Sequence, residues 1–111
     1  MAKSINYQRG KNLIYKIYYK KNPKKFFIGA TTQQYICKRF HQHITYYQFL
    51  KKHKKRLEDS KQKLYDFVEK HGGWKKFKCK LLQMIPCKSK EELTFKEFEC
   101  IQKEQPTLNV L

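Results

Sequence analysis

Residues 11–19, KNLIYKIYY, and residues 25–29, KFFIG, decide the fold of this chain. In the first stretch, every second side chain from position 13 to position 19 is leucine, tyrosine or isoleucine. That alternation, together with the many β-branched and aromatic residues, is typical of a β-strand. Asn22-Pro23 lies between the two stretches and favours a turn. We therefore predict that the two stretches pair as an antiparallel hairpin.

Two helices are predicted after the hairpin. Thr31 and Gln34 have the spacing of a capping box, and apolar residues then recur at helical spacing to about Lys52. A charged break follows, and a second helix is predicted over about residues 58–71. Gly72-Gly73 would end that helix, because glycine accepts the left-handed cap conformation.

The remaining part of the chain predicts one more strand and one more helix. A strand is expected over about residues 77–85, where Phe77, Cys79 and Leu81 alternate with Lys76, Lys78 and Lys80, and Pro86 ends it. Ser89 and Glu92 form a second capping box, which opens a helix to about Gln102. The order β-β-α-α-β-α predicts an α/β domain with a small three-stranded antiparallel sheet flanked by helices. We expect this domain over residues 12–111, after an N-terminal arm of residues 1–11.

The charge of the chain points to a polyanionic partner. The 111 residues include 26 Lys and Arg against 9 Asp and Glu, a formal net charge of +17. DNA or RNA fits best, because neutralising phosphates releases counterions, whereas a solubilising surface needs far less charge. Gly29 would let a ligand approach the backbone closely, or would only turn the chain into the helix. The lysines expected to contact DNA phosphates are Lys38, Lys51, Lys52, Lys54, Lys55, Lys76 and Lys78.

The sequence indicates a protein that stays inside the cell. It has no run of about 18 apolar residues and no signal-peptide pattern near Met1, so neither a membrane span nor secretion is expected. The four cysteines are expected to be free thiols in a reducing compartment. Their spacing includes no Cys-x-x-Cys pair, so a structural zinc site is not expected.

Glu97 is the most informative candidate for chemistry. It lies four residues after Leu93 and four before Ile101, which places a carboxylate on the inward face of the last helix. A buried carboxylate is costly unless it is paired or binds a metal. The pattern alone also fits a lysine or arginine partner across the core, or a rotated helix that leaves Glu97 in solvent.

Three further residues could take part in phosphate chemistry. Arg39 and His43 are four apart, so they share one face of the first helix. A guanidinium can hold two phosphate oxygens, and histidine can move a proton near neutral pH. The phenol of Tyr15 could exchange a proton with a reacting water. Ordinary packing and a solvated helix edge remain alternative readings of these positions.

Read in order, LIYKI, FFIG, KRFHQH and the segment from HGGW to PTLN resemble the GIY-YIG nuclease superfamily. The resemblance covers about residues 12–110, and its second half is similar to virus-borne members. It implies catalytic roles for Tyr15, Arg39, His43, Glu97 and Asn109, and it places Gly29 at the glycine of YIG. It also implies a single Mg²⁺ or Mn²⁺ held by Glu97. We expect these side chains to converge on one concave face.

Two positions depart from the family pattern. Leu13 replaces the first glycine of GIY, which many members tolerate. Phe27 replaces the first tyrosine of YIG and removes a hydroxyl, for which Tyr18, Tyr19 and Tyr35 are candidate replacements. Loss of one such group would slow the reaction by roughly 10²–10³-fold if it acts in the transition state.

Three functions follow from these observations. The first is a metal-dependent DNA endonuclease, and the second is a catalytically weakened GIY-YIG-fold module that binds DNA. The third, a structural basic protein such as a nucleic-acid packaging factor, leaves the ordered motifs unexplained. Specificity would be low or would come from a homodimer or a partner protein. The virus-like second half favours a viral or mobile-element origin, with action in a host cytoplasm or nucleus.

Overall fold

The computed structural model describes residues 12–33, 35–57, 59–87 and 89–109. The predicted N-terminal arm therefore lies outside the described residues, as does Gln34 of the first predicted capping box. A short 3-10 helix, residues 74–76, lies between the second helix and the third strand. The elements in chain order are β1 (Asn12–Tyr19), β2 (Asn22–Thr31), α1 (Ile36–Lys52), α2 (Ser60–Lys70), η1 (Trp74–Lys76), β3 (Phe77–Ile85) and α3 (Lys90–Glu104).

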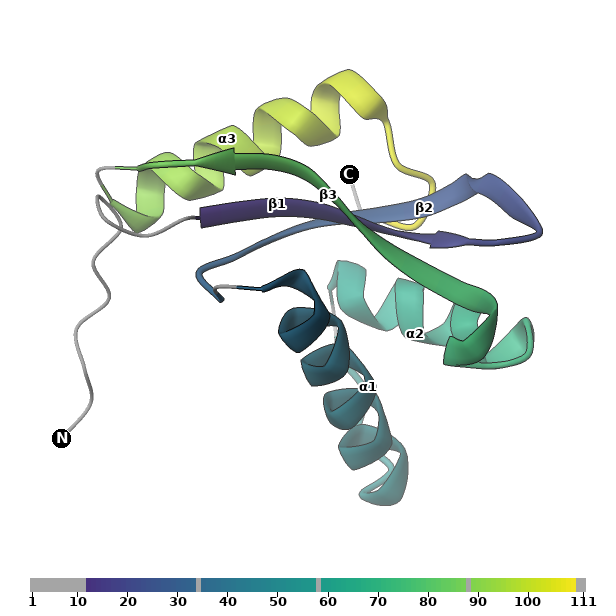
Figure 1. The fold of residues 1–111 in the computed structure, drawn as a ribbon. Coiled ribbons are helices and arrows are strands. Elements are labelled where there is room, and N and C mark those ends of the chain that lie inside the picture. The colour runs from purple at the N-terminus through teal and green to yellow at the C-terminus, as the bar shows by residue number, and fades with distance from the viewer. Residues whose placement is uncertain (1–11, 34, 58, 88, 110–111) are drawn as a thin grey trace, which may run out of the picture.

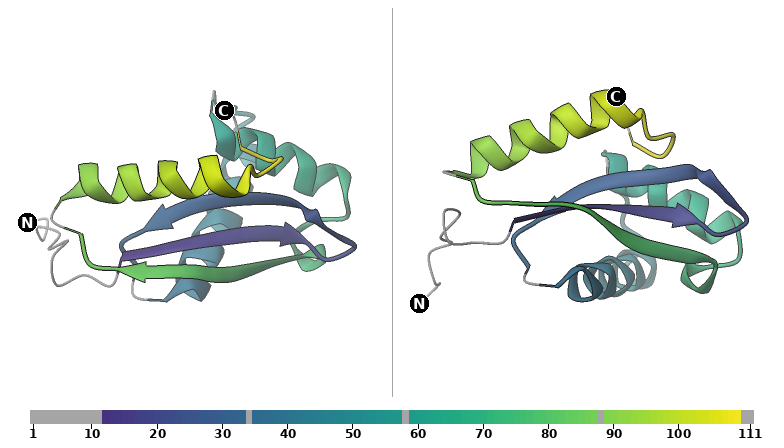
Figure 2. Two further views of the ribbon diagram at one scale, coloured as in Figure 1. Left: turned by 90° about the horizontal axis from the view of Figure 1, so that it is seen from above. Right: turned by 45° about the horizontal axis from the view of Figure 1, so that its top comes forward.

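The three strands form one antiparallel sheet in the order β2-β1-β3. The helices α1 and α2 cover one face of this sheet, and α3 covers the other face (Figures 1 and 2). The predicted α/β fold and its element order are confirmed. β1 is the central strand and is covered on both faces, so Ile14 and Tyr15 are both completely buried although they point to opposite sides.

The hairpin is tighter than predicted. Its turn consists of Lys20 and Lys21, and β2 already begins at Asn22, so the prediction that Asn22-Pro23 forms the turn is wrong. Pro23 is tolerated in the strand because β2 is an edge strand, where a missing N–H does not interrupt a second ladder. The register between β1 and β2 shifts next to this segment, between Tyr18 and Tyr19.

The start of α1 also differs from the prediction. The helix begins at Ile36 with Tyr35 in the cap position, and Tyr35 makes no side-chain cap hydrogen bond. Thr31 is not the cap because it is paired with Leu13 at the end of β2. Its hydroxyl instead accepts a hydrogen bond from the Gln33 N–H at 3.1 Å.

The cap of α3 and the main core follow the sequence patterns. The Ser89 hydroxyl accepts a hydrogen bond from the Glu92 N–H at 3.2 Å, so the second capping box is confirmed on that side. The core lies between the sheet and the pair α1 and α2, where Ile17, Leu64 and Val68 have no exposed surface. This core fixes one end of Tyr15, which belongs to the same cluster.

Candidate active site

Tyr15 lies opposite Gly29 in the β1–β2 pairing. A Cβ atom built on Gly29 would lie 2.6 Å from Cζ of the Tyr15 ring, which is closer than real Cβ atoms approach. Gly29 is itself buried. The absence of a side chain at position 29 therefore makes room for the phenol. The sequence suggested that Gly29 lets a ligand come close to the backbone. In the structure, the group that comes close to Gly29 is the Tyr15 side chain.

The Tyr15 hydroxyl joins a chain of hydrogen bonds that links β1, α1 and α2. It lies 3.1 Å from Nε of Arg39, which donates to it, and 2.6 Å from Nε2 of His43. Nδ1 of His43 lies 2.9 Å from the hydroxyl of Tyr65. Because Arg39 and His43 are one helical turn apart, α1 presents both side chains to the same phenol.

The donors in this chain can be assigned from the chemistry of its members. Arg39 can only donate, so the Tyr15 oxygen accepts from it, and His43 Nε2 is positioned to accept the phenol hydrogen. A neutral imidazole then carries its hydrogen on Nδ1 and donates to Tyr65. His43 is thus oriented as a proton acceptor for Tyr15.

Burial controls the protonation of both groups. Burial raises the pKa of Tyr15 to about 12, and the nearby Arg39 partly opposes that shift. Burial lowers the pKa of His43 to about 3, and the positive charge of Arg39 acts in the same direction. At neutral pH the phenol is therefore protonated and the imidazole is neutral.

Glu97 lies on the inward side of α3 and is half-buried, as its spacing predicted. Burial raises the pKa of its carboxyl group, while a hydrogen bond from the Ala30 backbone and the charge of Arg39 lower it. Glu97 and Arg39 line one hollow of about 350 Å³, together with Thr31, Gln42 and Lys90. Glu97 is therefore partly shielded from solvent at the edge of this hollow.

A second, smaller hollow lies on the other side of Glu97. It measures about 190 Å³ and is lined by Glu97, Phe27, Asn109 and two residues at the start of α2, Asp59 and Lys61. Lys61 also lowers the pKa of both Glu97 and His43 through its charge. Glu97 thus lines two hollows, one together with Arg39 and the other together with Lys61.

The structure places Asn109 next to the site, although its polar atoms bind the backbone. Its Oδ1 accepts from the Ile28 N–H at 2.8 Å, and its Nδ2 donates to the Ile28 carbonyl at 2.9 Å. Asn109 is buried and fastens the segment after α3 to β2, beside Phe27. This geometry fits a positioning residue, so direct contact with a substrate stays a prediction.

The tyrosines that the sequence suggested as replacements for the hydroxyl missing at Phe27 lie in different surroundings, and Tyr18 is on the opposite face of β1 from Tyr15. Tyr19 packs against Phe67 and Phe77, and Tyr35 is 52% exposed. Tyr65, from α2, supplies the extra hydroxyl of the hydrogen-bonded chain. The sequence pattern of α2 did not indicate this contact, because it depends on the tertiary packing of α2 against His43.

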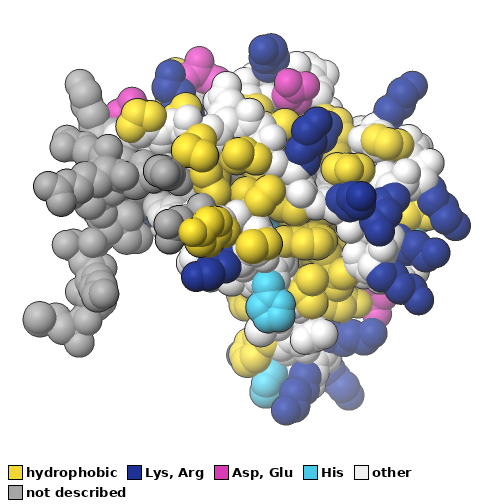
Figure 3. All heavy atoms as spheres, viewed as in Figure 1, with side chains coloured by type: hydrophobic (Ala, Val, Ile, Leu, Met, Phe, Trp, Pro, Cys, Tyr) yellow, Lys and Arg dark blue, Asp and Glu magenta, His cyan; other side chains and the backbone are white. Residues whose placement is uncertain are grey.

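Five of the seven lysines expected to bind DNA lie on α1 or directly after it, and the other two lie on η1 and β3. Lys51 pairs with Glu69 at 3.1 Å, and Lys76 is half-buried. The others, Lys38, Lys52, Lys54, Lys55 and Lys78, are exposed. The hollows beside Glu97 are lined instead by Lys90 and Lys61, which the sequence did not single out. Figure 3 shows many Lys and Arg side chains and few acidic ones on one face.

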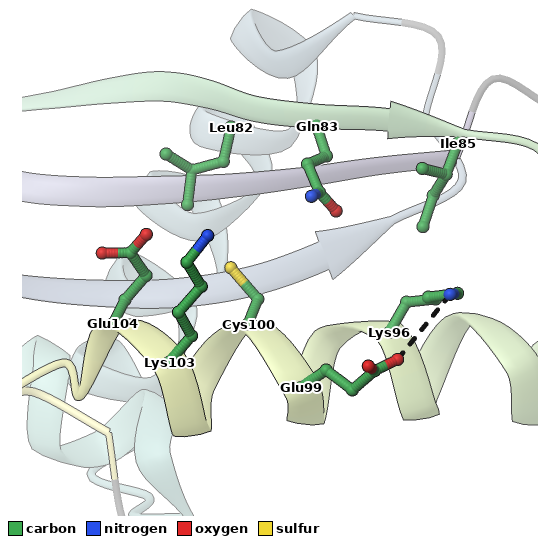
Figure 4. A pocket seen from close by; sticks show the side chains of 8 residues that line it. All are labelled: Leu82, Gln83, Ile85, Lys96, Glu99, Cys100, Lys103 and Glu104. Carbon is green, nitrogen blue, oxygen red and sulfur yellow. Dashed lines mark ion pairs between the residues drawn. The ribbon is translucent and has the colours of Figure 1, made fainter.

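A third hollow, of about 570 Å³, lies between β3 and α3 on the other face of the sheet. Leu82, Gln83 and Ile85 point into it from the strand, opposite Cys100 and Lys103 of the helix (Figure 4). Lys96 and Glu99 form an ion pair of 3.7 Å at its edge. Tyr15 and Arg39 lie across the sheet from it, so we place the candidate site in the smaller hollows.

The donor set at Glu97 fits one kind of metal site. Among the residues that the structure describes, no group of three or more His, Cys, Asp or Glu could hold a metal ion. Mg²⁺ is commonly bound by one or two carboxylates while water and substrate phosphates complete its shell. The half-buried Glu97 could supply such a carboxylate. Zinc, which takes several protein ligands, would not fit.

Comparison with protein-family models, with curated proteins and with solved structures gives no match for this chain. Within the described ranges, no helix combines the length and the apolar character that a membrane crossing requires. The four cysteines are free thiols. Fold and site geometry are therefore the basis for a functional proposal.

Proposed function

We propose that this protein is a metal-dependent DNA endonuclease of the GIY-YIG type, which hydrolyses phosphodiester bonds. One observation carries the proposal. A buried phenol is hydrogen-bonded to both a guanidinium and a neutral imidazole, and the guanidinium shares a hollow with a half-buried carboxylate. A proton acceptor, a cation and a carboxylate are groups that metal-assisted phosphate hydrolysis can use.

In the proposed reaction, Tyr15 takes a proton from the attacking water while its own proton passes to Nε2 of His43. The water oxygen forms a bond to phosphorus, and the bond from phosphorus to the leaving oxygen breaks. Arg39 stabilises the negative charge that develops on the phosphate. Its guanidinium has five donors, and its contacts with Tyr15 and Gln42 use only Nε and one hydrogen on Nη1.

Glu97 would hold the divalent cation, Mg²⁺ or Mn²⁺. When bound there, the cation would neutralise charge on the phosphate and on the leaving oxygen. Ala30 assists from the protein side, because its backbone hydrogen bond to Glu97 favours the ionised carboxylate. Lys61 and Lys90, at the two hollows, would attract the DNA backbone.

A second candidate is the DNA-binding module without efficient cleavage. It is favoured by Phe27, which is 4% exposed and packs its ring against Tyr15 and His43 where a tyrosine would add a hydroxyl. In that reading the basic surface still binds DNA. The network around Tyr15 would then serve mainly to hold α1 against the sheet.

The proposal is tested with supercoiled plasmid and purified protein in Mg²⁺ or Mn²⁺. The wild-type protein is expected to convert the plasmid to nicked or linear forms. No such conversion is expected in the presence of chelator or with Glu97→Gln. Glu99→Gln is the matched control, because Glu99 lies two residues away on α3 and pairs with Lys96. Cleavage that survives Glu97→Gln would overturn the proposed site. DNA binding with no cleavage in either metal would select the second candidate.

We propose further that the protein acts inside a cell, on the DNA of a virus, mobile element or host. Its free thiols fit a reducing compartment. Lysine contacts to phosphate give affinity without sequence choice. A partner protein or a second copy of the chain would therefore supply any sequence specificity.

A further inference from the structure

The outer face of α1 carries aromatic side chains that the site described above does not use. Tyr46 is 40% exposed and Phe49 is 47% exposed. Their ring planes are 9° apart, and the ring centroids are separated by 6.3 Å. Both rings border a shallow hollow of about 660 Å³, which His41, Gln42 and Thr45 also line. Two nearly parallel aromatic rings are thus open to a ligand.

Positive charge flanks these rings. Residues 36–57 contain no Asp or Glu. Lys38 and Lys52 are exposed, and they lie three or four residues from Gln42 and Phe49, so they share the outer stripe of the helix. On the face shown in Figure 3, hydrophobic side chains lie next to histidines and to Lys and Arg. A ligand of this stripe must offer flat apolar groups and negative charge together.

The stripe is continuous with the candidate active site. Gln42 lines both the hollow that contains Arg39 and Glu97 and the hollow that contains Tyr46 and Phe49. Its Oε1 accepts a hydrogen bond from Nη1 of Arg39 at 3.3 Å. Seven residues of helix separate Gln42 from Phe49, a rise of about 10 Å. That length accommodates a few nucleotides of an extended strand.

We propose that Tyr46 and Phe49, with Lys38 and Lys52, bind unpaired nucleotides of the DNA strand that enters the site. Unpaired bases can stack on aromatic rings while lysines contact the phosphates between them. Bases within a duplex are already stacked on each other and leave no face for the rings. A second copy of this chain is disfavoured as the occupant, because each copy carries a net charge of +17.

This inference rests on the proposed function and narrows its substrate. The preferred DNA would have a single-stranded segment beside the bond that is cut, as at a flap, a gap or a frayed end. Contacts to such a segment read structure rather than base sequence. The protein could then select its cleavage position without a separate sequence-reading domain.

Binding is measured by fluorescence anisotropy, in chelator, with a labelled single-stranded oligothymidine and with a duplex of equal length. Phe49→Ala is expected to weaken single-strand binding by about 5- to 150-fold, the range for loss of one stacked base, and to change duplex binding little. Phe95→Ala is the matched control, because Phe95 is 59% exposed on α3, across the sheet. Phe49→Trp should retain binding, and oligothymidine should quench its fluorescence beyond that of Trp74 in wild type.

Three results would overturn the inference. They are equal weakening of single-strand and duplex binding by Phe49→Ala, equal effects of Phe49→Ala and Phe95→Ala, and a wild-type dimer that Phe49→Ala dissociates. Circular dichroism of each variant shows whether it remains folded. The assay needs no cleavage, so failure of the nuclease proposal would appear in the plasmid assay and not here.

Discussion

Tyr15 and Gly29 face each other across the β1–β2 pair, and the phenol ring occupies the space that a side chain at position 29 would need. The contact involves the same hydroxyl that binds Arg39 and His43. A change at Gly29 therefore acts on the candidate catalytic group without touching any solvent-exposed surface.

Gly29→Ala is expected to displace the Tyr15 ring, to reduce stability by about 1–3 kcal/mol and to reduce cleavage. The free energy of unfolding is measured in urea, and cleavage on plasmid. The same substitution in a Tyr15→Phe background should cost less, because the hydroxyl is part of the clash. An equal loss of stability in the two backgrounds would show that Gly29 is not required to make room for the Tyr15 hydroxyl.

Tyr15→Phe is expected to slow cleavage by about 10²–10⁴-fold, because the proton acceptor for the attacking water is lost. Single-turnover rates at saturating protein separate this effect from DNA binding, which should be unchanged. Tyr18→Phe is the control, since Tyr18 lies on the opposite face of the same strand. Similar rates for wild type and Tyr15→Phe would remove Tyr15 from the mechanism.

His43 should make the fold sensitive to acid. Its pKa is about 3 in the folded protein and 6.5 for the free side chain, so the unfolded chain binds the proton first as pH falls. The free energy of unfolding is therefore unaffected by the protonation of His43 above about pH 6.5, and it falls as the pH drops from there toward 3. Urea unfolding at pH 4.5 should show a loss of about 3 kcal/mol that His43→Gln lacks. Parallel pH profiles for the two proteins would contradict the buried neutral imidazole.

Glu97→Gln is expected to abolish metal-dependent cleavage and, at neutral pH, to stabilise the fold. The pKa of Glu97 is raised mainly by burial, so the folded state disfavours the ionised form. The stability difference should therefore grow as pH rises above the usual glutamate range and vanish below it. Thermal and urea unfolding of both proteins measure it. A destabilised Glu97→Gln would indicate a structural carboxylate.

Phe27→Tyr is expected to increase the cleavage rate by up to about 10²-fold, because it restores a hydroxyl beside the hollow that Glu97 lines. The plasmid assay under single-turnover conditions provides the rate. Phe26→Tyr is the neighbouring control on the other face of β2. An unchanged rate for Phe27→Tyr would show that the missing hydroxyl does not limit the reaction.

Most of the fold followed from local patterns in the sequence. Period-two alternation located β1 and β3, and Ser89 located the start of α3, because these signals depend on nearby residues alone. The start of α1 did not follow, since strand pairing with Leu13 overrides the capping preference of Thr31. Likewise, Pro23 signals a turn, although an edge strand can accommodate it.

The candidate site was only partly predictable. Helical spacing put Arg39 next to His43 and turned Glu97 inward. Tyr65 and Lys61 could not be found that way, because they reach the site from α2 through packing across the core. The contact between Gly29 and Tyr15 was not predicted, because no sequence pattern indicates which side chain fills the space beside a glycine. The proposed catalytic and DNA-binding roles remain predictions.

The central position of β1 has a consequence for synthesis of the protein. Its first neighbour, β2, follows it directly, whereas β3 and Glu97 are made more than fifty residues later. Such non-local pairing forms slowly, because a long loop must close first. On the ribosome, the nascent chain therefore carries Tyr15 and Arg39 well before the carboxylate exists. In the proposed nuclease, a partial translation product that ends before α3 would lack Glu97, so we expect cleavage to require the later part of the chain.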